Sequence, residues 1–150
     1  MVIQEMTAPE CRAMLAGRKI ARLACARNNQ PYVVPVQLDF DGEFFYGYST
    51  VGLKVEWMRE NPLVCLEIDT ITSQVEWETV VVFGQYEELP ATPDNEELRS
   101  VAEGLFQGNP MWWEPASVSV ASHQPRSPVV FRIRITSVTG RRAFTDSPHT

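Results

Sequence analysis

Histidine and cysteine are scarce in this chain, and their spacing argues against several kinds of site. The 150 residues include two histidines, His123 and His149, and three cysteines, Cys11, Cys25 and Cys65. Neither histidine lies at metal-ligand spacing from a cysteine or from the other histidine, so a zinc site is not supported. No C-x-x-C pair occurs, and we interpret the cysteines as small buried side chains in a reduced, cytoplasmic protein.

The chain also lacks the glycine-rich and serine motifs of common nucleotide-binding and hydrolase folds. It contains no G-x-x-x-x-G-K-[ST] loop, no G-x-G-x-x-G turn after a strand and no G-x-S-x-G elbow. P-loop, Rossmann and serine-hydrolase chemistry therefore have no support. The first twenty residues, MVIQEMTAPECRAMLAGRKI, show no apolar signal region, and no long apolar span follows, so we expect no membrane segment.

Basic residues are too few and too scattered for a polyanion-binding surface. Lysine and arginine number 13 against 19 acidic residues, which gives a net charge of −6 at pH 7. We therefore expect neither nucleic acid nor an anionic membrane surface as a partner. A local phosphate site stays compatible with this balance, because it needs only one or two cations and some backbone N–H groups. The length predicts one domain over residues 1–150.

The residue pattern predicts a mainly β chain with short helices. Thr7-Ala8-Pro9-Glu10 has the form of a capping box, and the helix that it opens should end at Gly17. A second short helix follows Gly52, and a third should be capped by Asp94. Strands are expected over 20–26, 31–40, 43–49, 63–69, 74–89 and 128–144. Mostly sequential strands with helices between them indicate an antiparallel barrel plus helices.

The stretch YSTVGLKVEW places a lysine in the first turn of the second helix. The positive end of the helix dipole disfavours a cation there, unless an anion binds beside it and offsets the repulsion. Ser49 supplies a hydroxyl, Gly52 lets the backbone approach a ligand closely, and Lys54 supplies charge beside free helix N–H groups. This combination suggests a phosphate site. The alternative is a capped surface helix with a solvated lysine.

Two further features suggest a planar ligand or an interface. Pro35, in YVVPVQL, cannot donate to a sheet ladder, so it predicts an edge or a bulge. An open backbone edge can serve the polar rim of a planar ligand, and simple edge protection is the alternative. Trp112 and Trp113 lie in a predicted loop, where they would cover the core, a flat ring or a dimer interface.

Taken together, these stretches resemble the FMN-binding split-barrel superfamily typified by pyridoxamine 5′-phosphate oxidase. Within it, the chain looks most similar to the flavin-nucleotide-binding branch that includes 5-nitroimidazole reductases. The resemblance covers about residues 17 to 90. It is carried by GRKIARLACARNNQPYVVPVQLDFDGEFFYGYS, by Gly52-Leu53-Lys54 leading to RENPLVCLEID, and by EWETVVVFGQYEEL, with a weaker echo in VVFRIRITSVTGRRAF.

The resemblance implies a six-stranded antiparallel split β-barrel with short flanking helices, and a homodimer with two FMN sites at the subunit interface. It places one strand segment along the isoalloxazine, the helix start at the 5′-phosphate, and a later strand beside the flavin from the same or the partner chain. The position of one loop tryptophan suggests a cover over the flavin or substrate. The segment along the isoalloxazine is Val34, Pro35 and Val36, and the phosphate-binding residues at the helix start are Ser49, Gly52 and Lys54. The later strand contributes Trp77 and Thr79, and the covering tryptophan is Trp113.

Two departures from the family pattern bear on the activity. Tyr48 stands where relatives among the nitroimidazole reductases commonly carry histidine, which disfavours that activity but not FMN binding. Tyr48 is also the candidate proton donor near the ring, with interface packing as the alternative. The C-terminal pattern with which the oxidase holds pyridoxal phosphate is not recognisable, so vitamin B6 oxidation is disfavoured.

The expected function is that of an FMN-dependent oxidoreductase. It would pass a hydride or electrons between a reduced nicotinamide and a small-molecule acceptor. One alternative is a flavin-binding module without turnover, a carrier or sensor. Another is a reductase that uses a deazaflavin, and a third is a split barrel that has lost its flavin and serves as an interaction protein. The sequence does not separate these alternatives.

Overall fold

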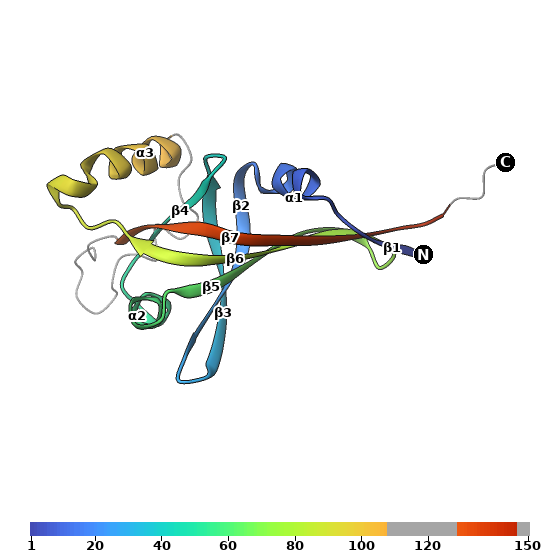
Figure 1. Ribbon diagram of the computed structural model, residues 1–150, viewed down its shortest axis with the longest axis horizontal. Helices are drawn as coiled ribbons and strands as arrows, with labels where there is room; N and C mark the ends of the chain where they lie inside the picture. Colours follow the sequence, from blue (N-terminus) through green and yellow to red (C-terminus); the bar gives the residue numbers. More distant parts are fainter. Residues whose placement is uncertain (108–128, 147–150) are drawn as a thin grey trace, which may run out of the picture.

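The computed structural model describes residues 1–107 and 129–146 as one antiparallel sheet with short helices (Figure 1). The strands are β1 (Val2–Glu5), β2 (Gly17–Arg27), β3 (Gln30–Phe40), β4 (Phe44–Ser49), β5 (Leu63–Ser73), β6 (Glu76–Glu88) and β7 (Val129–Phe144). The helices are α1 (Ala8–Leu15), α2 (Leu53–Glu60), the 3-10 turn η1 (Pro93–Asn95) and α3 (Glu96–Phe106).

Six of the strands close into a barrel, as predicted. The sheet order is β1-β7-β4-β3-β2-β5-β6, and a further pairing of β6 with β7 closes the ring. β1 lies outside the ring, on the far end of β7, where Val2 pairs with Phe144 and Glu5 with Arg141. Its four residues are exposed and show no alternation, which is why the sequence did not predict this strand.

The β2–β3 hairpin shows how local residues set the register. Asn28 and Asn29 have φ of 50° and 64°, the left-handed conformations that a tight hairpin turn needs and asparagine tolerates. The two strands then pair along their whole length, from Gly17 with Phe40 to Arg27 with Gln30. This register turns every second residue of β3, beginning at Tyr32, toward the core.

The barrel is split between β3 and β4. The two strands pair only at Asp39 with Tyr46 and Phe40 with Phe45, beside the turn that joins them. Beyond that point β4 continues along β7, while β3 stays paired to β2 alone. The second edge of residues 30–38 is therefore unpaired within the described part of the chain. Pro35 lies on this open edge and is exposed, as its missing N–H predicts.

Two apolar clusters stabilise the fold. The larger fills the barrel and is closed at one end by α2, whose Val55 and Met58 are fully buried. The smaller lies under α3 and contains Tyr46, Leu89, Ala102 and Val130. Cys11 and Cys25 are buried as predicted, whereas Cys65 is only half-buried because its side of β5 faces outward.

The helix ends agree with prediction at α1 and differ at α3. The Glu10 N–H donates to the Thr7 hydroxyl at 3.3 Å, and the Glu10 side chain reaches back to the Thr7 N–H, which confirms the capping box. The prediction that Asp94 caps the third helix was wrong. Pro93 instead opens the η1 turn, and Asn95 precedes α3 without a side-chain cap.

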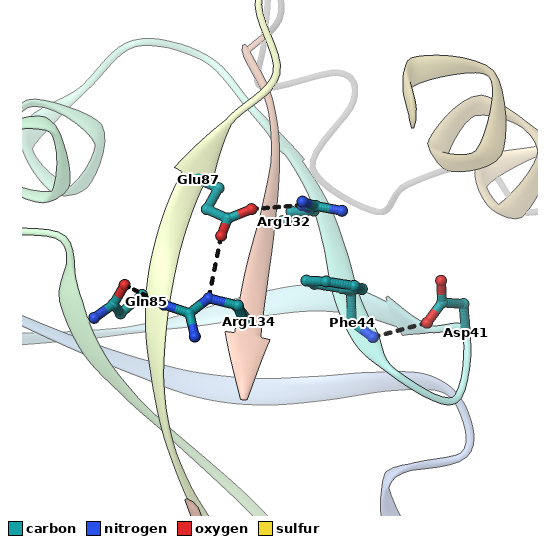
Figure 2. Close-up of polar contacts among 6 residues, drawn as sticks. All are labelled: Asp41, Phe44, Gln85, Glu87, Arg132 and Arg134. Atoms are coloured by element: carbon teal, nitrogen blue, oxygen red, sulfur yellow. Dashed lines mark hydrogen bonds and ion pairs between the residues drawn. The ribbon is translucent and has the colours of Figure 1, made fainter. Parts of the chain in front are cut away.

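A polar network ties β4, β6 and β7 together (Figure 2). Glu87 accepts from Arg132 Nε at 2.6 Å and from Arg134 Nε at 3.3 Å. The Arg132 guanidinium also lies 4.0 Å from the centre of the Phe44 ring. Asp41 shapes the β3–β4 turn by accepting from the Phe44 N–H at 2.7 Å. One carboxylate thus holds two arginines, of which only Arg132 is largely buried, at 18% side-chain exposure.

Candidate functional site

The N-terminus of α2 has donors without an acceptor in the described part of the chain. Its N-cap, Gly52, carries no side chain to cap the helix, and the first intrahelical bond runs from the Glu56 N–H to the Gly52 carbonyl at 3.1 Å. The N–H groups of residues 53–55 therefore have no acceptor in the helix, and they add to the positive end of its dipole. This end of the helix is suited to an anion.

Lys54 lies in this first turn and is half-buried. Burial lowers the pKa of Lys54 below its ordinary value, and the group that opposes this shift is the Cys25 thiol of β2. No carboxylate pairs with Lys54 among the described residues. A partly desolvated ammonium at the positive end of a helix is unfavourable by itself. A bound phosphate would remove both costs.

Ser49 ends β4, three residues before Gly52, and is buried. Its hydroxyl donates to the Thr50 carbonyl at 3.0 Å, so it offers a ligand only its lone pairs. The structure therefore brings Ser49, Gly52 and Lys54 onto one turn. Of the three, Lys54 and the backbone N–H groups are the donors that an anion requires.

The β3 segment of Val34, Pro35 and Val36 lies on the open edge near this turn. Val34 pairs with Leu23 of β2, and two residues further along β2 is Cys25, the group beside Lys54. Val34 and Val36 face the core, whereas Pro35 points outward. The structure thus places the predicted ring-binding segment and the predicted phosphate-binding turn around the same end of β2.

Tyr48 lies on the other face of β4 from Ser49. Its ring packs edge-on against Phe106 of α3, with 6.1 Å between the ring centres. The described contacts of Tyr48 are therefore packing contacts, and its role as proton donor stays a prediction. Trp113 lies outside the described residues.

Trp77 and Thr79 occupy the opposite end of β6 from α2. The Tyr86 N–H bonds to the Pro62 carbonyl, directly after α2, whereas Trp77 pairs with Ala143 near the end of β7. The seven residue steps from Thr79 to Tyr86 span roughly 23 Å of strand. Thr79 also faces outward from the sheet, whereas Cys25, beside Lys54, is buried in the barrel, so one copy of the chain does not bring Thr79 and Lys54 into a single site.

Thr79 belongs to a polar cluster that sequence reasoning missed. Its hydroxyl donates to Glu67 Oε1 at 2.9 Å, across β5 and β6. Arg22 of β2 lies 3.1 Å from Asp69 and 3.8 Å from Glu67. Burial raises the pKa of Glu67, and the adjacent Asp69 adds to the rise. The only signal in the sequence was two acids spaced two apart in an otherwise apolar strand.

A cavity of about 440 Å³ lies beside this cluster. Residues of β1, β6 and β7 line it, among them Glu5, Thr79, Val81, Thr139 and Arg141. Its wall combines hydroxyl, guanidinium and carboxylate groups with an apolar strand side chain. The cavity can therefore take a partly polar small molecule or one end of a larger one.

The outer face of the sheet carries exposed apolar side chains from four adjacent strands, β3, β2, β5 and β6. The strand registers place them on one side of the sheet. They are Ile20, Val33, Leu63, Ile71 and Phe83, each between 49% and 69% exposed. A surface of this composition is typical of a protein–protein contact.

Neither a metal centre nor a membrane-spanning helix is found in the described residues. No group of three or more histidine, cysteine, aspartate or glutamate side chains within 1–107 and 129–146 could hold a metal ion. None of the helices in those ranges is long and apolar enough to cross a bilayer.

Comparison with known proteins identifies close relatives over nearly the whole chain. Residues 7–142 match the family described as pyridoxamine 5′-phosphate oxidase. An uncharacterized protein of Rhizobium meliloti is 37% identical over 146 residues, which cover 95% of this chain and 97% of the relative. A FAD-binding protein from Mesorhizobium loti of known structure is also 37% identical, with a TM-score of 0.81, covering 96% of this chain and all of the other.

The same fold extends to a more distant structure. A candidate 5-nitroimidazole antibiotic resistance protein from Bacteroides thetaiotaomicron is 14% identical with a TM-score of 0.64, and the match covers 97% of this chain and 93% of the other. At this identity the likeness concerns the fold alone. These matches agree with the resemblance seen in the sequence.

Proposed function

The chain belongs to the pyridoxamine 5′-phosphate oxidase family, and from this premise we propose that it is a flavin-dependent oxidoreductase. The proposed cofactor is FMN, and the proposed reaction passes electrons between a reduced nicotinamide and a small acceptor. Bound flavin supplies the redox chemistry, while the protein supplies binding, orientation and exclusion of water. A cytoplasmic location, where free thiols persist, forms part of the proposal.

The observation that carries the proposal is the state of Lys54. It is a half-buried cation without a carboxylate partner among the described residues, at a helix end whose N–H groups are also unsatisfied. A phosphate bonded to these groups would gain charge-assisted hydrogen bonds and restore the pKa of Lys54. The residues present therefore fit a nucleotide phosphate.

The open edge of β3 would orient the ring of the cofactor. Residues 30–38 have one backbone edge without a partner strand in the described chain. Because Arg27 and Gln30 close a two-residue turn, Val34 and Val36 bond back to β2, and the groups on the open edge belong to the alternate residues Val33, Pro35 and Gln37. Unpaired backbone N–H and C=O groups complement the polar rim of an isoalloxazine, while the missing N–H of Pro35 keeps another strand from adding there. The edge thus binds a planar ligand without promoting aggregation.

A second copy of the chain would complete the site. Lys54 lies beside the buried Cys25 at the α2 end of the barrel, whereas Thr79 faces outward near the other end of β6, so we infer that both reach one cofactor only if they come from different copies. The exposed apolar side chains on the outer face, Phe83 among them, provide the contact surface for that copy. We therefore propose a homodimer with two flavin sites at its interface.

Flavin titration of the apoprotein tests the proposal. Wild-type protein should bind FMN with flavin absorption bands and a raised melting temperature. Lys54→Met should weaken binding by about 10- to 100-fold, because it removes a charge-assisted contact. The matched control is Lys19→Met, since Lys19 is the only other lysine of the chain. Indifference of the wild type to FMN, or equal affinity in both variants, would contradict the assignment.

The relative from Mesorhizobium loti makes FAD the second candidate cofactor, because it is a FAD-binding protein of 37% identity. Titration with FMN, FAD and a deazaflavin in parallel ranks the three. Consumption of NADH or NADPH by the loaded protein with an added acceptor then separates an oxidoreductase from a flavin carrier or sensor. Tight stoichiometric binding without any turnover would favour the carrier.

A further inference from the structure

The contact between Thr79 and Glu67 fixes the direction of a hydrogen bond. The two side chains lie 2.9 Å apart, from Thr79 Oγ1 to Glu67 Oε1. A threonine hydroxyl has a single hydrogen, and an ionised carboxylate can only accept. With Glu67 ionised, the hydrogen of Thr79 is used by Glu67, and Thr79 Oγ1 can offer a ligand nothing but its lone pairs.

The charged groups around Glu67 decide whether this direction holds. Arg22 of β2 lies 3.8 Å from Glu67 and favours the ionised carboxylate. Asp69, on the same strand, opposes it, as does burial, although Asp69 is itself paired with Arg22 at 3.1 Å. On the β7 side, Arg141 is paired in register with Thr79 and adds a further positive charge. Arg141 is also paired in register with Glu5 of β1, so two cations and three carboxylates lie across five strands.

The cavity beside Thr79 offers a complementary set of donors. Thr139 and Arg141 line it together with Thr79, so donor groups stand on the same wall as the fixed acceptor. A ligand that matches this wall presents an N–H group flanked by carbonyl oxygens. The oxidised isoalloxazine has one N–H, at N3, and it lies between the C2 and C4 carbonyls.

We propose that Glu67 is a positioning residue, which holds Thr79 as the hydrogen-bond acceptor for the N3–H of the flavin bound at Lys54 of a second copy. The inference rests on the proposed function and adds to it a residue outside the predicted site. It also implies that this cavity wall selects heterocycles that carry an N–H group between two carbonyls.

Binding of FMN and 3-methyl-FMN tests the inference, because the methyl group removes N3–H. Wild-type protein should prefer FMN by about 10-fold, the size of one hydrogen bond to a well-fixed acceptor. In Glu67→Gln the amide can donate to Thr79, the acceptor is no longer fixed, and the preference should fall toward unity. Thr79→Val should show the same loss, while Thr79→Ser should retain the preference. Glu76→Gln, an exposed acid on the same strand, is the control.

A second readout does not depend on affinity. In 15N-labelled FMN, the N3 resonance should show a hydrogen-bonded, slowly exchanging N–H in the wild type and in Glu76→Gln, and faster exchange in Glu67→Gln. An unchanged FMN preference and unchanged N3 exchange in Glu67→Gln would overturn the inference and leave the proposed function intact. Failure of the wild type to bind FMN would overturn both.

Discussion

At Lys54, two effects both lower the stability of the folded apoprotein. Burial removes water from the ammonium group, and the helix N–H groups repel it. Groups held in such positions commonly belong to a binding site, because selection for the ligand outweighs the loss of stability. At the scale of a single residue, therefore, we expect that replacing Lys54 raises the stability of the apoprotein, and this increase would mark the site.

Lys54→Met should stabilise the apoprotein while it weakens flavin binding. Methionine fills a similar volume and carries no charge to desolvate. We expect the melting temperature of the apoprotein to rise by about 2–4 °C, which corresponds to roughly 1 kcal/mol in a domain of this size. Thermal unfolding of flavin-free wild type and variant measures it. Lys19→Met should leave the melting temperature nearly unchanged, and a destabilised Lys54→Met would count against the argument.

The stability difference should also depend on pH in a defined direction. Because burial lowers the pKa of Lys54, the unfolded chain binds more protons than the folded chain between the lowered value and the ordinary 10.5. The free energy of unfolding of the wild type therefore rises with pH across that window, relative to Lys54→Met. Denaturant unfolding from pH 7 to pH 10 should show the advantage of the variant shrinking. A constant difference would indicate that the pKa is not lowered.

At the scale of the element, one shared carboxylate links side chains of β6 and β7. Glu87 bonds both Arg132 and Arg134 from adjacent outward positions of β7 (Figure 2). Arg132 also stacks on Phe44 of β4, so it links three strands. Arg134 is 46% exposed and bonds only to β6, through Glu87 and Gln85.

Arg132→Met should therefore destabilise the protein more than Arg134→Met. Loss of Arg132 removes a largely buried ion pair and a cation–π contact, and we expect a cost of about 2–3 kcal/mol in the free energy of unfolding. Loss of the exposed Arg134 should cost about 0–1 kcal/mol. The two arginines share Glu87 as partner and differ in burial. Urea unfolding of both variants measures the difference in the free energy of unfolding. Equal costs would mean that burial does not set the strength of this network.

Local sequence signals predicted most of the strands, turns and helix ends. The remaining features depend on pairing between residues far apart in the sequence. The Asn28-Asn29 turn, the alternation of β3 and the capping box at Thr7 are encoded within a few residues, so they could be predicted. β1 could not, because its exposed residues become a strand only by pairing with β7. The Glu67–Thr79 contact depends on the register of the β5–β6 hairpin, which residue types alone do not fix.

At the scale of the whole molecule, the outer face of the sheet is the surface to test. Phe83 of β6 is 49% exposed on this face and pairs with Cys65 of β5. Phe83→Asp would place a charge in the proposed contact. The variant should be monomeric in analytical ultracentrifugation and should bind FMN at least about 10-fold more weakly, because each site then lacks Thr79 of the second copy.

The matched control for Phe83→Asp is Val101→Asp, on the exposed side of α3 at 41% exposure. It should retain both the dimer and the FMN affinity of the wild type. A monomeric wild type that binds FMN tightly would contradict the two-copy site. So would a monomeric Phe83→Asp variant with unchanged affinity.

Trp57 follows Lys54 by one turn of α2 and is only 8% exposed. Its ring centre lies 5.6 Å from that of Tyr32, and the Arg27 guanidinium lies 5.0 Å above it. Indole emission overlaps flavin absorption, so a flavin seated at Lys54 should quench the fluorescence of Trp57 by energy transfer. Trp77, at the far end of β6, would be quenched to a similar degree only by the flavin of a second copy. Two of the chain's four tryptophans therefore serve as intrinsic optical probes, one for each end of the proposed site. The fluorescence lost in Trp57→Phe and in Trp77→Phe would give the contribution of each without any attached dye.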